Sequence, residues 1–261
     1  MATFLQNLKQ FLFGRPQGQP YQSARSNEFC AAMDAASRHC RSGNTALAEQ
    51  QCQAMIHQLQ EIANEHTDIA SQRFVAGGFF DVGGVYREME RVPDAERCFA
   101  IAIEKFESLR NYLTEARYAD SMLAGCQNQL GMLYSDCGPL AQAETALDNA
   151  IARRKRIMSE VPDDMENRIY LAGAICNRAH VASKLGQREP AISLYDQSLQ
   201  LIDETIPPCD CGCRDAIFSA ISELNGHPHW VLTAHRFRQN AEAGRRYLTD
   251  PSTDLDESGL R

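Results

Sequence analysis

The sequence has 261 residues, of which 44% are hydrophobic and 23% are charged, proportions typical of a chain that buries a core. Its net charge of −8 argues against nucleic-acid binding, because contacts with phosphates require a concentrated basic surface. No stretch reaches the about 18 consecutive apolar residues that a membrane-spanning helix needs, so we expect no such span.

The first predicted element is an amphipathic helix over residues 1–13. Its apolar side chains share one face: Phe4, Leu5, Leu8, Phe11 and Leu12. It has three open interpretations: a cap on the first repeat, a segment that docks on a partner, or a helix at a membrane interface. The segment lacks a charged start and a small-residue cleavage site, so we do not expect a secretory signal. Residues 14–27 are polar with proline and glycine, which predicts a linker.

Helical hairpins are predicted next, and together they form an array over residues 28–206. The hairpins occupy about 28–65, 67–111, 113–160 and 164–205. Alanine, leucine and glutamine dominate this part and β-branched runs are scarce, which favours helix. Glycine or proline stands in each expected turn.

Three columns of residues recur in this array with a step of 48. The columns are Gly83, Gly131 and Ala179; Ala95, Ala143 and Ala191; and Phe99, Leu147 and Tyr195. A fainter copy precedes them at Ala36, Gly43, Ala48 and Cys52. Small residues let two antiparallel helices approach closely, and the large residue fills the remaining space. The pattern therefore predicts an all-α repeat fold.

The motif resembles the tetratricopeptide repeat, in which Leu-Gly and Tyr are followed by Ala, a large residue and Ala. Leu130-Gly131 with Tyr134 fits the first helix, and Ala143, Leu147 and Ala150 fit the second. The match has departures, because Gln127 replaces the leading aromatic residue and Arg178-Ala179 replaces Leu-Gly.

The long step makes the array similar to those of kinesin light chain and of bacterial tetratricopeptide proteins. The usual repeat has 34 residues, and the extra length corresponds to about two more turns in each helix. The resemblance implies a right-handed α-solenoid that acts as a non-catalytic scaffold and binds a protein or peptide in its concave groove. Motifs for phosphate binding, nucleophilic catalysis and zinc proteolysis are missing, so we expect neither catalysis nor a cofactor.

The resemblance also places the peptide-binding groove on the first helix of each hairpin. The positions carried over in register are Phe80, Gly84, Arg87, Asn128, Met132, Ser135, Asn177, His180 and Lys184. Asparagine amides can donate and accept at once, which suits a ligand backbone. The alternative is that Asn128 and Asn177 only bridge adjacent helices. The family's mode of reading a C-terminal carboxylate needs a lysine pair that these positions lack, so we do not expect it.

A pair of capping helices is predicted within residues 207–249, with a weak echo of the repeat at Phe237 and Ala241. An acidic, apolar-poor tail at 250–261 is predicted to be disordered. The loop before the second capping helix contains an unusual cluster: Cys209, Cys211, Cys213, His227 and His229. It is a candidate for zinc binding or redox chemistry, although the spacing between its cysteines is too short for the usual zinc motif.

The other seven of the ten cysteines fall in predicted helices, where a thiol behaves as a small hydrophobic group. They are Cys30, Cys40, Cys52, Cys98, Cys126, Cys137 and Cys176. Without an expected secretory signal, we interpret them as reduced thiols of a cytoplasmic protein.

Overall fold

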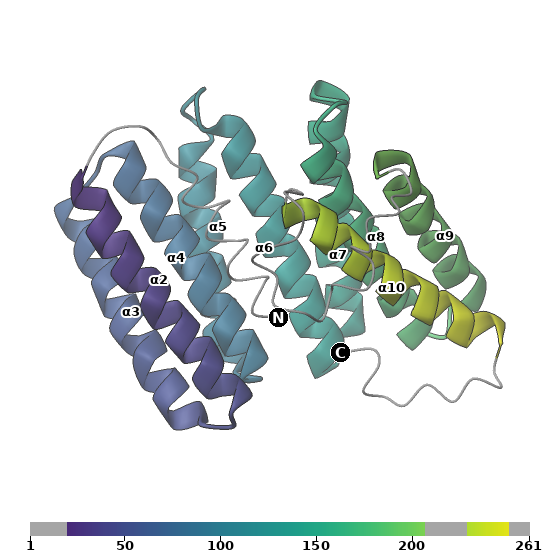
Figure 1. Cartoon of the computed structure of the whole chain (residues 1–261), viewed down its shortest axis with the longest axis horizontal. Coiled ribbons are helices and arrows are strands. Elements are labelled where there is room, and N and C mark those ends of the chain that lie inside the picture. The colour runs from purple at the N-terminus through teal and green to yellow at the C-terminus, as the bar shows by residue number, and fades with distance from the viewer. Residues whose placement is uncertain (1–19, 207–228, 251–261) are drawn as a thin grey trace. The chain divides into compact units, whose positions relative to one another are not determined.

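The computed structural model describes residues 20–206 and 229–250, with side chains for 28–206 and 233–250. This part of the chain is all-α, with nine helices and no strand (Figure 1). The helices are α2 (Pro20–Arg41), α3 (Thr45–Glu65), α4 (Ile69–Glu88), α5 (Val92–Leu109), α6 (Ala116–Cys137), α7 (Leu140–Glu160), α8 (Met165–Lys184), α9 (Arg188–Thr205) and α10 (His229–Thr249). The all-α prediction is confirmed.

The first described helix corrects one boundary. α2 begins at Pro20, so the second half of the segment predicted as a linker at 14–27 belongs to this helix. Proline is tolerated in the first turn of a helix, because the missing N–H would have no partner within the helix there. The proline and glycine content that suggested a linker therefore marks the approach to a helix start.

Side chains cap three of the helices at their N-termini. Asn44, Asp68 and Asp164 each accept a hydrogen bond from the backbone N–H three residues later, at the starts of α3, α4 and α8. The first N–H groups of a helix have no partner within it, so such caps fix where the helix begins. α5 begins instead with a proline in its first turn.

Two compact units make up the chain, residues 1–126 and 127–261, and α6 runs across their boundary. In the first unit α2 packs on α3 and α4, α3 packs on α4, and α4 packs on α5. In the second unit α7 packs on α8, α8 packs on α9, and α10 lies against both α8 and α9. Packing between consecutive helices is the arrangement expected for helical hairpins.

The columns read from the sequence lie in the cores of these units. The alanines at 95, 143 and 191 are completely buried, and so are Phe99 and Leu147. A Cβ added at Gly83 would lie 2.8 Å from Phe99 Cε1, and one added at Gly131 would lie 2.8 Å from Leu147 Cδ2. Each glycine therefore makes room for the large residue of the second helix in its own hairpin.

The turn inside each hairpin contains one residue with positive φ. These residues are Gly43 (77°), Glu90 (59°), Gly138 (108°) and Gly186 (74°). No neighbouring atom lies within 4 Å of a Cβ added at any of the three glycines. The left-handed backbone, and not a lack of space, therefore favours glycine in these turns.

α10 is packed closely on the end of the second unit. A Cβ added at Gly173 of α8 would lie 2.8 Å from Phe237 Cδ2, and one added at Gly244 of α10 would lie 2.9 Å from Tyr195 Cε1. Two ion pairs, Arg238 with Asp203 and Arg245 with Asp196, join α10 to α9. Its predicted partner at 214–225 lies outside the described residues.

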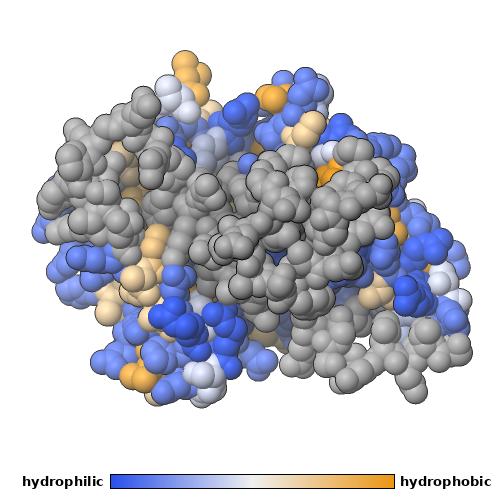
Figure 2. Space-filling model, in the orientation of Figure 1, coloured by the Kyte–Doolittle hydropathy of each residue, from blue (hydrophilic) through white to orange (hydrophobic). Residues whose placement is uncertain are grey.

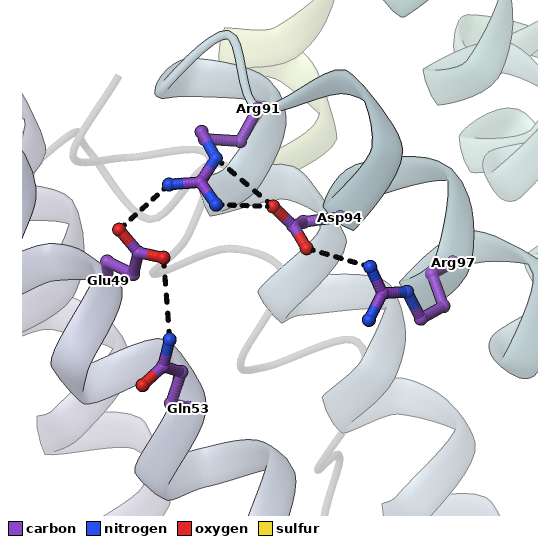
Figure 3. A network of polar contacts seen from close by, with 5 residues as sticks. All are labelled: Glu49, Gln53, Arg91, Asp94 and Arg97. Atoms are coloured by element: carbon purple, nitrogen blue, oxygen red, sulfur yellow. Dashed lines mark hydrogen bonds and ion pairs between the residues drawn. The ribbon is translucent and has the colours of Figure 1, made fainter.

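In the first unit, a chain of polar contacts joins the second helices of consecutive hairpins (Figure 3). Arg91, at the start of α5, contacts Glu49 of α3 at 2.8 Å and Asp94 at 2.9 Å. Asp94 also accepts from Arg97 at 3.1 Å, and Glu49 accepts from Gln53 at 3.4 Å. Exposed ion pairs of this kind contribute little to stability individually, so we interpret the network as a weak surface contact between α3 and α5.

Candidate functional site

The positions predicted for the peptide-binding face lie on three first helices. α4 carries Phe80 and Arg87 in the first unit, whereas the second unit contains Asn128, Met132 and Ser135 on α6 and Asn177, His180 and Lys184 on α8.

Phe80 is part of the core of the first unit. Its exposed fraction is 4%, and its ring meets the ring of Phe99 edge-on, with centroids 6.0 Å apart. A Cβ added at Gly125 would touch the same ring at 3.6 Å. Phe80 therefore offers a ligand almost no surface. Arg87 is half-buried, and its charge counteracts the burial that raises the pKa of neighbouring Glu88.

In the second unit, the two asparagines contact each other. Asn177 Nδ2 donates to Asn128 Oδ1 at 3.0 Å, which joins α8 to α6. Asn128 Nδ2 in turn points at the sulfur of Met132, 3.7 Å away, a weak acceptor. Both amides are half-buried. The two asparagines therefore bridge adjacent helices, which was one of the two roles predicted for them from the sequence. This contact leaves the Oδ1 atom of Asn177 and further N–H groups of both amides able to meet a second partner.

Lys184 makes a second contact between the same helices. Its Nζ donates to the backbone oxygen of Ser135 at 2.9 Å, in the last turn of α6. The last carbonyls of a helix lack partners within it and carry partial negative charge, so a lysine is well placed there. The Ser135 side chain is 7% exposed, whereas Lys184 is exposed. Of these two residues, only Lys184 presents its side chain to solvent.

His180 lies one turn before Lys184 on α8 and is half-buried. Burial lowers its pKa from the ordinary value, the charge of Lys184 lowers it further, and Asp136 acts in the opposite direction. His180 is therefore neutral at pH 7, with one ring nitrogen that donates and one that accepts.

Arg178 was not among the predicted site residues, yet it bonds two carboxylates between α8 and α7. Its Nε donates to Asp148 at 3.0 Å, and its Nη2 contacts Glu144, both on α7. Only 12% of its side chain is exposed. The sequence did contain one indication of Arg178. It stands where the better-matched repeat has Leu130, which is a departure from the repeat motif.

The alternative sites fall largely beyond the described structure. Cys209, Cys211, Cys213 and His227 are outside the described residues, as is the segment 1–13, and the side chain of His229 is not described either. Over residues 28–206 and 233–250, no group of three or more His, Cys, Asp or Glu side chains is arranged to hold a metal ion. Among the described helices, none is long and apolar enough to cross a membrane.

The described surface is mainly hydrophilic in the view of Figure 2, with apolar residues scattered over it. The large apolar side chains that are exposed come from separate places in the chain, except for the adjacent Tyr112 and Leu113. Single exposed apolar residues are common on proteins and indicate no site. The polar contacts between α6 and α8 therefore indicate a binding site better than the exposed apolar residues do.

A comparison with protein families matches residues 123–164 to the tetratricopeptide repeat. The matched segment covers most of α6 and all of α7, including the contact of Gly131 with Leu147. Residues 123–164 thus form a tetratricopeptide repeat, and the helical hairpins on either side support a tetratricopeptide repeat protein. No curated protein matches it. Tetratricopeptide repeats generally serve as interaction scaffolds and not as catalysts, which agrees with the class expected from the sequence.

Proposed function

We propose that this tetratricopeptide repeat protein is a non-catalytic scaffold that binds a protein or peptide segment along its first helices. The observation that carries the proposal is the polar face of α6 and α8 in the second unit. Asn128, Asn177, His180 and Lys184 all lie on this face and all keep some exposed surface. The hydrophobic contacts of the hairpins use other positions, such as Leu147 and Tyr195.

The chemistry of this face suits an extended peptide backbone. A backbone presents N–H and C=O groups, and an asparagine amide can bond both. The contact between Asn177 and Asn128 fixes the orientation of the two amides before a ligand arrives. Amides held in place lose less conformational freedom on binding, which favours affinity.

Other parts of the proposal concern the setting of the protein. We place it in the cytoplasm, because Cys52, Cys98 and Cys176 are buried thiols without disulfide partners. The acidic net charge of −8 disfavours nucleic acid as the partner. The alternatives are zinc or redox chemistry at the Cys209–Cys213 loop and membrane docking by residues 1–13, both at residues outside the described structure.

Substitution of the amide pair tests the proposal. Peptides are first selected from a displayed random library against the full chain, and their affinity is measured by fluorescence anisotropy. In the double variant Asn128→Ala, Asn177→Ala, each unsatisfied backbone contact should cost about 1–3 kcal/mol. Affinity should therefore fall roughly 5- to 150-fold or more.

The matched control removes two exposed amides from the second helix of the same hairpin, as Gln142→Ala, Asn149→Ala. It should leave affinity unchanged. Thermal melting by circular dichroism is recorded for both variants to exclude unfolding. Equal affinity of the wild type and the Asn128/Asn177 variant would place the binding site elsewhere.

A further inference from the structure

Arg178 and Asn177 are neighbours in the sequence but contact different helices. Asn177 bonds Asn128 on α6, and Arg178 bonds Asp148 and Glu144 on α7. We propose that Arg178 is a positioning residue, which fixes α8 against the α6–α7 hairpin and thereby sets the amide pair in place. The role of that pair in ligand binding rests on the proposed function, whereas the positioning itself does not.

The contact of Arg178 is directional. Glu144 and Asp148 are four residues apart on α7, so their carboxylates lie on one face of that helix, one turn apart. A guanidinium group is planar and presents its N–H groups in a fixed fork, which suits two neighbouring acceptors. Only 12% of the Arg178 side chain is exposed, whereas the side chains of Glu144 and Asp148 are 33% and 58% exposed, so water reaches the carboxylates more easily than the guanidinium group. The contact therefore constrains both the rotation and the position of α8.

Helix geometry explains how Arg178 can position Asn177. Successive side chains of an α-helix diverge by about 100°, so Asn177 faces α6 when Arg178 faces α7. Lys184 follows Asn177 by seven residues, which returns it to nearly the same face, and it contacts Ser135 of α6. α8 is thus held at two points on α6 and at two on α7, because Asn167 of α8 also exchanges two buried hydrogen bonds with Arg154 of α7. A rotation of α8 that breaks the Arg178 contact also turns Asn177 away from Asn128.

The amide pair needs such support. Both asparagines are half-buried, so water competes for their donors and acceptors. A hydrogen bond also weakens steeply when its angle closes or its length exceeds the usual range. The pair is therefore sensitive to a small change in the register of α8.

The test observes the Asn177 side chain directly in the full-length protein, without a ligand. The side-chain NH2 signals of ¹⁵N-labelled protein are recorded by NMR, and those of Asn177 are assigned through their loss in Asn177→Asp. In Arg178→Gln the chemical shifts of these signals should move toward the values of a solvent-exposed amide. Their hydrogen exchange should become about 2- to 10-fold faster, as expected for the loss of one hydrogen bond.

Two further variants separate positioning from general destabilisation. Glu144→Ala, Asp148→Ala removes both acceptors of Arg178 and should reproduce the changes at Asn177, even if Arg178→Gln fails to fold. Arg245→Gln removes an ion pair between α10 and α9 of the same unit and should leave the Asn177 signals unchanged. Arg178→Lys keeps the charge without the fork and should restore the signals only in part.

Unchanged Asn177 signals in both Arg178→Gln and the double carboxylate variant would overturn the proposal. Changed signals with unchanged affinity for the selected peptides would support positioning and count against the proposed function. Loss of affinity in Asn128→Ala, Asn177→Ala with unaltered Asn177 signals in Arg178→Gln would support the proposed function and count against the positioning role of Arg178.

Discussion

Glu90 occupies a backbone conformation that three equivalent turns assign to glycine. Its φ is 59°, and the other turns have Gly43, Gly138 and Gly186 at positive φ. A left-handed conformation costs a residue with a Cβ about 1–2 kcal/mol, part of which the greater freedom of glycine in the unfolded chain offsets. We expect Glu90→Gly to raise the free energy of unfolding by about 0.5–1 kcal/mol, measured by urea denaturation.

The reverse change provides the control at the same turn position. Gly138→Ala introduces a Cβ at φ 108°, where no neighbouring atom lies within 4 Å. It should lower stability by about 1 kcal/mol, solely through the backbone. Equal stability of wild type and Glu90→Gly would show that contacts of the glutamate compensate for its conformation.

Among the helices, close packing depends on which glycine faces a neighbour. A Cβ at Gly131 would lie 2.8 Å from Leu147 Cδ2, whereas one at Gly84 would meet no atom within 4 Å. Both glycines lie inside first helices. We expect Gly131→Ala to lower the free energy of unfolding by about 1–3 kcal/mol, since the buried leucine must shift.

Gly84→Ala is the matched control for helix propensity. Glycine inside a helix is about 1 kcal/mol less favourable than alanine, so this variant should be more stable than the wild type. The two melting temperatures should therefore move in opposite directions. A stabilised Gly131→Ala would contradict the packing of α6 on α7 described above.

The hairpins could be predicted because their contacts depend on residue type. A glycine opposite a buried large residue, as with Gly131 and Leu147, can be recognised in the sequence from the residue types alone. The start of α2 could not be predicted, because proline and glycine are common both in linkers and just before helices. Helix ends thus remained less certain than helix existence.

The site was harder to predict than the fold, for physical reasons. Asn128 and Asn177 have amides that serve equally well as a bridge or as a ligand contact, and residue type alone does not decide between the two. Phe80 has a first-helix position but turns into the core against Phe99. Arg178 was missed because its carboxylate partners stand 34 and 30 residues earlier in the chain.

At the scale of the whole chain, each unit contains thiols whose pKa is raised by burial. Burial raises the pKa of Cys52 and Cys98 in the first unit, and of Cys176 in the second, to about 12. A raised folded-state pKa contributes stability that is fully present below the unfolded pKa, about 8.5 to 9, and is lost as pH rises toward 12.

We therefore expect the free energy of unfolding to fall between pH 8 and pH 10 by about 1–2 kcal/mol for each of these thiols. Urea denaturation under reducing conditions at pH 7, 8.5 and 10 measures the decline. Cys176→Ala serves as the comparison, because other titrating groups then contribute equally to both proteins. The variant starts less stable, owing to its smaller side chain, but should lose less stability as pH rises. Parallel pH profiles for the wild type and Cys176→Ala would mean that the thiol is ionised in the folded state as readily as in the unfolded chain, and that Cys176 is not sealed from solvent.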